Sequence, residues 1–400
     1  MSDIGRQGEY MLKAMKKIHL SGDSYTDIQT LFNNCIGCSD NSSFQKDLMH
    51  LCSKGILVMD GGKVNSAYIA SCEQTAAKHL ADILDNNVIE RPVPITSATV
   101  NGIELCAEQR RAISISLSHR LSLILGGAGT GKSTLIRGIT QAYSQSNCTY
   151  ITVAPTGKAA VNLRLKSGAQ SMTVHSLLGL GMETTDDRVD WNSIGLIIID
   201  EASMLTIEML SGILEHCRND CRIIMVGDNN QLQSVGAGNV IVDLIQLGFP
   251  VIQLFNNHRQ EDMSSALSQN VQNFTWFSGI EDFQFDNSFM LIDMPEYSIQ
   301  KFICEEAAKR YTKKESFQLL SPVNHSGNLS VSSLNNSLHS IVNPCADKTE
   351  IIDNGNDLLW NGDRILVVQN NHSLGYCNGD IGRLRMNPEE STLNLAALDF

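Results

Sequence analysis

The sequence predicts an α/β fold built around a parallel sheet. Between residues 122 and 227, short apolar runs alternate with helical patterns, and each run leads into a glycine-rich or polar turn. Strands that alternate with helices in this way pair in parallel, and helices cover both faces of their sheet. The runs are SLIL (122–125), YITVA (150–154), LIIID (196–200) and RIIMVG (222–227). Chemistry is expected where their carboxyl ends meet the following loops.

The first 95 residues have a different texture and predict a winged-helix-like unit. Residues 7–18, 23–34 and 44–55 carry apolar side chains at helical spacing. Two alternating runs in 56–69 flank an Asp-Gly-Gly turn, which indicates a β-hairpin. Residues 73–86 follow as a linking helix, and Arg91-Pro-Val-Pro94 reads as a linker. Because no basic recognition helix is present, a protein-contact role is favoured over DNA binding.

Composition excludes several classes of protein. The 400 residues are 42% hydrophobic and 18% charged, which excludes a disordered chain and suggests two or three domains. A net charge of −13 excludes histone-like binding by bulk charge, although a local basic groove is compatible with it. The start lacks the features of a signal peptide, and no apolar run is long enough to span a membrane. A soluble, cytoplasmic protein is therefore expected.

Cysteine usage agrees with a reducing compartment. The 11 cysteines are scattered, an odd number that favours free thiols. Cys35 and Cys38 have metal-like spacing, but no second pair follows them. His216, Cys217 and Cys221 form the other local cluster. Ordinary thiols are favoured over a metal at both places.

A phosphate-binding loop follows the first predicted strand. Residues 126–133, GGAGTGKS, fit the pattern G-x-x-x-x-G-K-[ST], between a strand that ends at Leu125 and the helical pattern TLIRGITQAYSQ. The glycines allow backbone N–H groups and the helix N-terminus to surround phosphates. Lys132 is expected to reach the β- and γ-phosphates, and the Ser133 hydroxyl to hold Mg²⁺. The expected nucleotide contacts in this loop are Gly127, Gly129, Thr130, Gly131, Lys132, Ser133 and Thr134.

Two further strand ends complete the expected ATP site. The strand 197–199 ends in Asp200 and Glu201, which supplies one carboxylate for Mg²⁺ and another to polarise the attacking water. An adjacent glutamate favours hydrolysis over transfer to a hydroxyl acceptor, so the site indicates an ATPase. Gln231 follows the strand 222–227 and is placed to sense the γ-phosphate. Arg259 lies after VIQLF and could reach the phosphoryl group as an arginine finger does.

These segments occur in one order that resembles a known family. The series closely resembles the RecD-like helicases of superfamily 1B, including exodeoxyribonuclease V alpha subunits. Its segments are APTGKAA (154–160), TVHSLLG (173–179), IIIDEASML (197–205), GDNNQLQSVGAGNV (227–240) and NNHRQ (256–260). EQRRAI (108–113) looks like the family's Q motif, and 319–339 and 361–382 look like parts of its second motor domain.

The resemblance implies an ATP-driven motor that moves 5′ to 3′ on single-stranded DNA, in recombination or repair. It assigns adenine contact to Gln109, and Mg-ATP binding to Lys132, Ser133 and Asp200. Glu201 is the implied catalytic base. The implied readers of the γ-phosphate are Gln231 and Arg259. The implied DNA contacts are Pro155, Thr156, Lys158, Thr173, Val174 and His175. RecB- and RecC-like subunits are the implied protein partners.

The expected domain plan follows from the same comparison of segments. Residues 1–95 form the winged-helix-like domain, 96–262 a RecA-like ATPase domain, and 263–400 a partial second RecA-like domain. Within the ATPase domain, 179–193 is either a pin-like insertion with Trp191 at its foot or tip, or a solvated loop. ATP is expected in the cleft between the motor domains. The basic side chains of Lys158, Arg164 and Lys166 fit a DNA groove or a solvated helix face equally well.

Departures from the family pattern leave alternatives open. Gln233 stands where the family usually has proline, and two later motifs do not occur before Phe400. Nucleotide binding with impaired unwinding is expected if those motifs are truly absent. The first alternative is an ATP-binding, non-motor subunit of a RecBCD-like complex. The second is a winged-helix DNA-binding regulator, and a small-molecule kinase is third because no acceptor site is apparent.

Overall fold

The chain divides into two compact units, Met1–Glu261 and Asp262–Phe400. The structure is a computed structural model. The residues that it describes are 6–35, 40–90, 99–100, 102–127, 129–180, 189–228, 231, 233–255, 266–273, 278–315, 317–343, 351–353, 358–367, 381–386 and 393–396.

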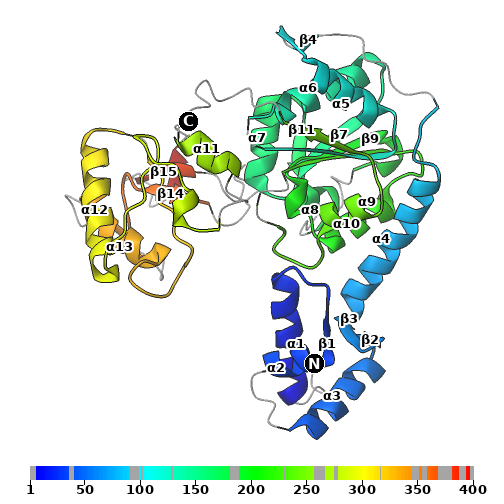
Figure 1. The fold of residues 1–400 in the computed structure, drawn as a ribbon, viewed down its shortest axis with the longest axis horizontal. Coiled ribbons are helices and arrows are strands. Elements are labelled where there is room, and N and C mark those ends of the chain that lie inside the picture. The colour runs from blue at the N-terminus through cyan, green and yellow to red at the C-terminus, as the bar shows by residue number, and fades with distance from the viewer. Residues whose placement is uncertain are drawn as a thin grey trace. The chain divides into compact units, whose positions relative to one another are not determined.

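A six-stranded sheet forms the centre of the first unit (Figure 1). Every strand pair in it is parallel, and its strands are apolar because both faces are covered. Its strands, in spatial order, are β11 (Val251–Leu254), β6 (Leu121–Gly126), β10 (Arg222–Gly227), β9 (Leu196–Ile199), β7 (Tyr150–Ala154) and β8 (Ser171–Thr173). The predicted α/β class and all four predicted strands are confirmed.

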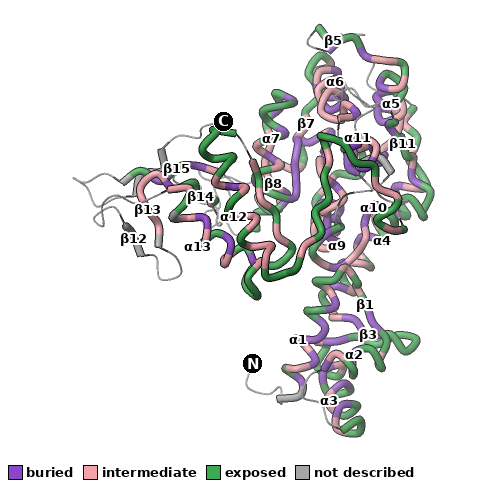
Figure 2. The backbone as a smooth tube through the Cα atoms, turned by 60° about the vertical axis from the view of Figure 1, so that its left-hand side comes forward, coloured by how far each residue is buried: buried purple, intermediate pink, exposed green. Residues whose placement is uncertain are grey.

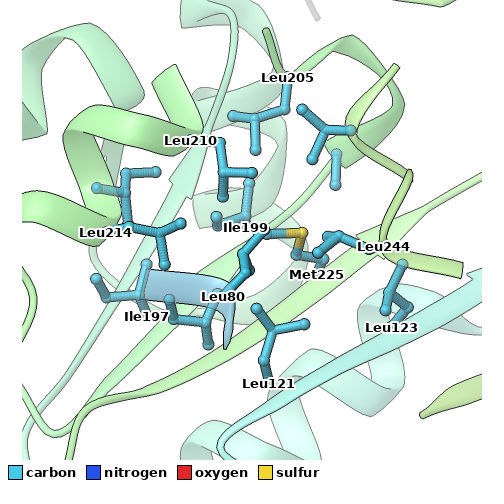
Figure 3. Close-up of a cluster of buried hydrophobic side chains, with 14 of the residues drawn as sticks. Leu80, Leu121, Leu123, Ile197, Ile199, Leu205, Leu210, Leu214, Met225 and Leu244 are labelled. Atoms are coloured by element: carbon cyan, nitrogen blue, oxygen red, sulfur yellow. The ribbon is translucent and has the colours of Figure 1, made fainter. Parts of the chain in front are cut away.

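Alternate side chains of these strands enter two separate cores, so the domain has three layers. Leu123, Ile197 and Met225 point to one face, which is covered by α4 (Ala67–Asp85), α8 (Val174–Leu177), α9 (Ile207–His216) and α10 (Val240–Gln246) (Figure 3). Ile124 and Ile198 point to the other face, which is covered by α5 (Ala107–Leu117), α6 (Lys132–Gln145) and α7 (Gly157–Ser167). Figure 2 colours the residues by burial: β7 is buried in its second half, whereas the edge strand β11 alternates exposed and buried residues.

The linking helix belongs to the core of the sheet domain. α4 begins at Ala67, six residues before the predicted start, because the Ser66 side chain caps it by accepting a bond from the Ile69 N–H at 3.2 Å. Ala76, Leu80 and Ile83 of this helix are buried in the core beneath α9. The compact unit Met1–Glu261 includes both sides of the boundary expected near residue 95, which stays a prediction, and the linker Arg91–Pro94 lies outside the described residues.

The N-terminal segment combines three helices with a three-stranded antiparallel sheet of order β1-β3-β2. Its core contains Met11, Leu31 and Phe44, each 0% exposed. The helix predicted over 23–34 begins only at residue 28, because the Asp27 carboxylate caps it by accepting the Thr30 N–H at 2.8 Å. The elements are α1 (Arg6–Leu20), β1 (Tyr25–Asp27), α2 (Ile28–Asn34), α3 (Asn41–Ser53), β2 (Leu57–Asp60) and β3 (Lys63–Ser66).

The second unit contains helices and small antiparallel sheets in its described part. The buried carboxylate of Asp363 connects the start of β14 (Arg364–Leu366) to the helix α13 (Val331–Val342). It lies 2.7 Å from His339 Nε2 and accepts the Asn343 Nδ2–H at 2.7 Å. The second RecA-like domain stays a prediction, since the described strands do not pair in parallel. The elements are α11 (Ala266–Asn273), α12 (Glu296–Thr312), α13 (Val331–Val342), β12 (Ile351–Asp353), β13 (Leu358–Trp360), β14 (Arg364–Leu366), β15 (Ile381–Met386) and β16 (Leu393–Ala396).

Two other sequence expectations concern metals and membranes. Within the described ranges, no cluster of three or more histidine, cysteine or acidic side chains could hold a metal ion. Cys38 lies outside those ranges, while Cys35, Cys217 and Cys221 are not joined in disulfides. Among the helices that the structure describes, none combines the length and apolar character needed to cross a bilayer.

Candidate nucleotide-binding site

The phosphate-binding pattern forms a tight loop between β6 and α6. β6 ends at Gly126, and α6 begins at Lys132, as the pattern predicts. Gly129 and Gly131 have φ values of +86° and +85°, a left-handed conformation that favours glycine. Gly131 is the N-cap of α6, so the first free N–H groups of the helix face the loop. This arrangement suits a bound phosphate.

Close packing at the base of the loop requires the first glycine. A Cβ atom on Gly126 would lie 2.6 Å from Thr130 Oγ1 and 2.9 Å from Leu254 Cβ. The Thr130 hydroxyl is buried and donates a hydrogen bond to the Gly127 carbonyl oxygen at 2.9 Å. A Cβ atom on Gly127 would meet nothing within 4 Å, so this backbone is open to a ligand.

Lys132 lies over the loop that it is expected to serve. Its Nζ donates hydrogen bonds to the carbonyl oxygens of Gly126 and Gly127, the latter at 3.1 Å. Ser133 and Thr134 follow in the first turn of α6 and are half-buried. A phosphate that entered the loop would therefore meet the ammonium group, the helix N-terminus and two hydroxyl groups together.

Asp200 lies at the same edge of the sheet as the phosphate-binding loop. Asp200 follows β9, which is separated from β6 by β10 alone, and its N–H donates to the Val153 carbonyl at 2.9 Å. Burial raises the pKa of Asp200 to about 6, and the negative charge of Glu201 acts in the same direction. A hydrogen bond from the Glu201 N–H and the positive charges of Lys132 and Lys166 oppose the increase. Lys132 thus lies near enough to Asp200 for its positive charge to act on the carboxylate.

Glu201 combines an unusual backbone with a buried charge. Its φ of +51° places a non-glycine residue in the left-handed region, a conformation that costs free energy and is common at functional sites. Its Oε2 atom is buried, and no described group forms a hydrogen bond with it. A buried carboxylate oxygen without a hydrogen-bond partner is costly, and a water molecule or ligand that entered the site would satisfy it.

The sensor segment lies beside this acidic turn. Gly227 ends β10, and a Cβ atom there would lie 3.4 Å from the Ser203 backbone nitrogen. Asp228 is buried, and its carbonyl accepts a hydrogen bond from the Gln231 N–H at 3.2 Å, while Gln231 itself is exposed. Arg259 lies outside the described residues, so its role stays a prediction.

Gln109 is less accessible than the resemblance implies. Its side chain is 5% exposed, and its Oε1 accepts a hydrogen bond from the Cys106 N–H at 3.1 Å in a capping box at the start of α5. This bond leaves the amide Nε2 as the group that could contact adenine. The neighbouring Glu108 Oε1 accepts the Phe255 N–H at 3.0 Å and ties α5 to the end of β11.

The expected DNA contacts gather at the ends of two neighbouring strands. Thr156 and Thr173 are the N-caps of α7 and α8, and their strands pair with Ala154 opposite Thr173. Lys158 and His175 are exposed, whereas Pro155 and Val174 are buried. The structure therefore presents two helix N-termini with exposed polar side chains at one edge of the sheet.

The expected pin-like insertion is described only in part. Residues 181–188 lie outside the described ranges. Trp191 begins a short 3-10 helix, packs against the core beneath α9, and has its ring 5.1 Å from that of His216. Trp191 is therefore partly buried, and the choice between a pin-like insertion and a solvated loop stays a prediction.

Comparisons with known proteins identify relatives of the part of the chain that carries these residues. Residues 104–275 match the family model described as an AAA domain. The RecBCD enzyme subunit RecD of Mycolicibacterium smegmatis is 31% identical over 194 residues, which are 41% of this chain and 35% of that protein. The ATP-dependent RecD2 DNA helicase of Deinococcus radiodurans is 34% identical over 157 residues, which are 39% of this chain and 22% of that protein. The chain thus spans about a third or less of these relatives.

The two loop glycines provide a matched test of the local geometry. We expect Gly126→Ala to lower the free energy of unfolding by about 1–3 kcal/mol, since the added methyl group must displace Thr130 or Leu254. Gly127→Ala should change it by less than about 0.5 kcal/mol, because its Cβ faces open space. Urea denaturation measures both values, and equal effects of the two variants would contradict this packing.

The buried Asp200 should destabilise the nucleotide-free fold above pH 6. Its folded pKa of about 6 exceeds the ordinary value of 3.8, so the folded protein binds more protons between these values and loses stability as the pH rises through them. We expect Asp200→Asn to raise the free energy of unfolding at pH 8, without Mg²⁺, by about 1–3 kcal/mol. Urea denaturation should show this gain shrinking toward pH 4, and a variant less stable than the parent at pH 8 would contradict the prediction.

Proposed function

We propose that this RecD-like chain is an ATP-dependent DNA helicase that hydrolyses Mg-ATP while it moves along single-stranded DNA. The observation that carries the proposal is the shared site of Lys132, Asp200 and Glu201 at one edge of the parallel sheet. The match of residues 104–275 to an AAA domain and the names of the RecD relatives support it.

Each group in the site suits one part of ATP hydrolysis. Lys132 and the α6 N-terminus bind the β- and γ-phosphates. Ser133 and Asp200 offer hydroxyl and carboxylate oxygens, the ligands that Mg²⁺ prefers, and a bound cation would favour ionised Asp200. Bound Mg²⁺ neutralises charge on the phosphates. Glu201 orients and polarises the attacking water, and Gln231 and Arg259 respond to the γ-phosphate.

DNA binding is proposed at the edge formed by α7 and α8. Thr156, Lys158 and His175 are exposed there beside two helix N-termini, which suits contacts with phosphates and sugars irrespective of base sequence. Movement from 5′ to 3′, a role in recombination or repair, and a cytoplasmic location are parts of the proposal that depend on the RecD-like sequence.

A second candidate is an ATP-binding, non-motor subunit of a larger assembly. The relatives from Mycolicibacterium smegmatis and Buchnera aphidicola are RecBCD subunits by name, which favours RecB- and RecC-like partners. Such a subunit would bind ATP in the same loop, and DNA would not stimulate its hydrolysis without those partners.

The rate of ATP hydrolysis with and without single-stranded DNA distinguishes these functions. We expect stimulation by oligo-dT in the parent chain and a loss of about 100-fold or more in Lys132→Ala, because this substitution removes the main positive charge at the phosphates. Lys78→Ala, which removes an exposed lysine of α4, is the matched control and should behave as the parent does.

Each other outcome points elsewhere. Nucleotide binding without stimulation by DNA would favour the non-motor subunit. DNA binding without any nucleotide binding would instead favour the winged-helix regulator and would contradict the proposed function.

A further inference from the structure

We propose that Arg137 is a positioning residue that couples the phosphate-binding helix α6 to the DNA-facing segment 155–175. This inference rests on the proposed function and adds a residue to it. Arg137 touches neither the phosphate-binding loop nor the exposed DNA-facing side chains in any described hydrogen bond. It acts by joining the elements that carry them.

The joint is a pair of hydrogen bonds from one guanidinium group. Arg137 Nε donates to the Ser167 carbonyl oxygen at 3.1 Å, and Arg137 Nη2 donates to the Lys166 carbonyl oxygen. These carbonyls end α7, where a helix leaves acceptors without partners within the helix and carries partial negative charge. The planar guanidinium group presents donors in a fixed fork, so one side chain satisfies both acceptors.

Further hydrogen bonds fix the C-terminal end of α7, so its attachment to Arg137 is rigid. Gly168, with a φ of +72°, closes the helix, and its N–H donates to the Arg164 carbonyl at 2.9 Å. The Ser167 hydroxyl donates to the Leu163 carbonyl at 2.6 Å and accepts the Ala169 N–H at 3.2 Å. Leu163 itself is buried in the same core as the apolar side chains of α6. A shift of α6 is therefore transmitted to α7 instead of being absorbed by a loose end.

The predicted DNA contacts lie before and after Lys166 and Ser167, the two residues that Arg137 bonds. Thr156 and Lys158 stand at the start of α7, and Thr173 and His175 follow β8. Between them, the Thr152 hydroxyl donates to the Gln170 carbonyl at 2.8 Å and fastens the connection to β7. Both DNA-facing groups thus belong to one braced segment that Arg137 attaches to α6.

Phosphate binding must disturb the other end of α6. Lys132 Nζ is bonded to the carbonyls of Gly126 and Gly127, and it has to leave them to reach a phosphate. Arg137 lies only five residues further along the same helix, between one and two turns away. Arg137 also bonds the backbone carbonyl of Lys166, a residue whose side-chain charge acts on Asp200. Arg137 therefore provides a hydrogen-bonded connection between the helix that starts at the phosphate-binding loop and the segment that carries the proposed DNA contacts.

The test separates coupling from simple structural support. Arg137→Ala removes both donors, Arg137→Lys keeps the charge and a single-point donor, and Lys78→Ala is the matched control for loss of an exposed positive charge. For each variant, one measures MgADP affinity, ATP hydrolysis with and without oligo-dT, the unfolding temperature, and hydrogen exchange of residues 156–175 with and without MgADP.

We expect Arg137→Ala to bind MgADP and to hydrolyse ATP without DNA as the parent does, while its stimulation by oligo-dT falls about fivefold or more. MgADP should alter hydrogen exchange of residues 156–175 in the parent and in Lys78→Ala, and this response should disappear in Arg137→Ala. Arg137→Lys should be intermediate in both measurements, and it replaces Arg137→Ala if the alanine variant fails to fold.

Three results would overturn the inference. The first is an unchanged stimulation ratio and exchange response in a folded Arg137 variant. The second is an equal loss of basal and DNA-stimulated hydrolysis, which would indicate structural support alone. The third is a parent chain that binds MgADP without any change in exchange at residues 156–175. If the parent chain binds no nucleotide, the proposed function itself fails, and the inference fails with it.

Discussion

The central constraint in this molecule is a buried carboxylate held near a lysine at the edge of a parallel sheet. Burial and the neighbouring Glu201 both act against the charge of Asp200, and Lys132 acts in its favour. Such a site is poorly satisfied by the protein alone. A divalent cation and a triphosphate would supply the opposite charges that the acidic turn and the loop each require, which favours the ligand that we propose.

The rest of the first unit serves to hold that edge in place. Two cores clamp the sheet, one beneath α4, α9 and α10 and the other beneath α5, α6 and α7. β10 lies between β6 and β9 and fixes the separation of the phosphate loop from the acidic turn. Glu201 in a left-handed conformation and the close approach at Gly126 show local strain and tight packing at the same edge. The fold therefore supports the geometry from which the site is built.

Local features of the sequence predicted the strands and the position of the glycine-rich loop well. The apolar strands and the glycine turn depend on neighbouring residues, so their patterns are visible in the chain. Contacts between residues far apart in the chain are not visible in such patterns. Examples are the burial of α4 in the sheet core, the bond of Glu108 to Phe255, and the bond of Arg137 to the end of α7, about 30 residues away. The Asp27 cap, which starts a helix later than predicted, was visible in the sequence as an N-cap residue, but helical spacing hid the short strand before it. Gln109 shows the converse, since a capping box uses the Oε1 atom of the side chain that the resemblance assigned to adenine.

Binding of Mn²⁺ as a substitute for Mg²⁺ tests the central claim most directly. The electron paramagnetic resonance signal of free Mn²⁺ reports how many ions the chain binds in the presence and absence of ADP. One tightly bound ion per chain that requires ADP, and that Asp200→Asn weakens at least about tenfold, would agree with a single site for phosphate and metal. Equal binding with and without ADP, or binding that ignores Asp200, would show that the loop and the acidic turn do not act together.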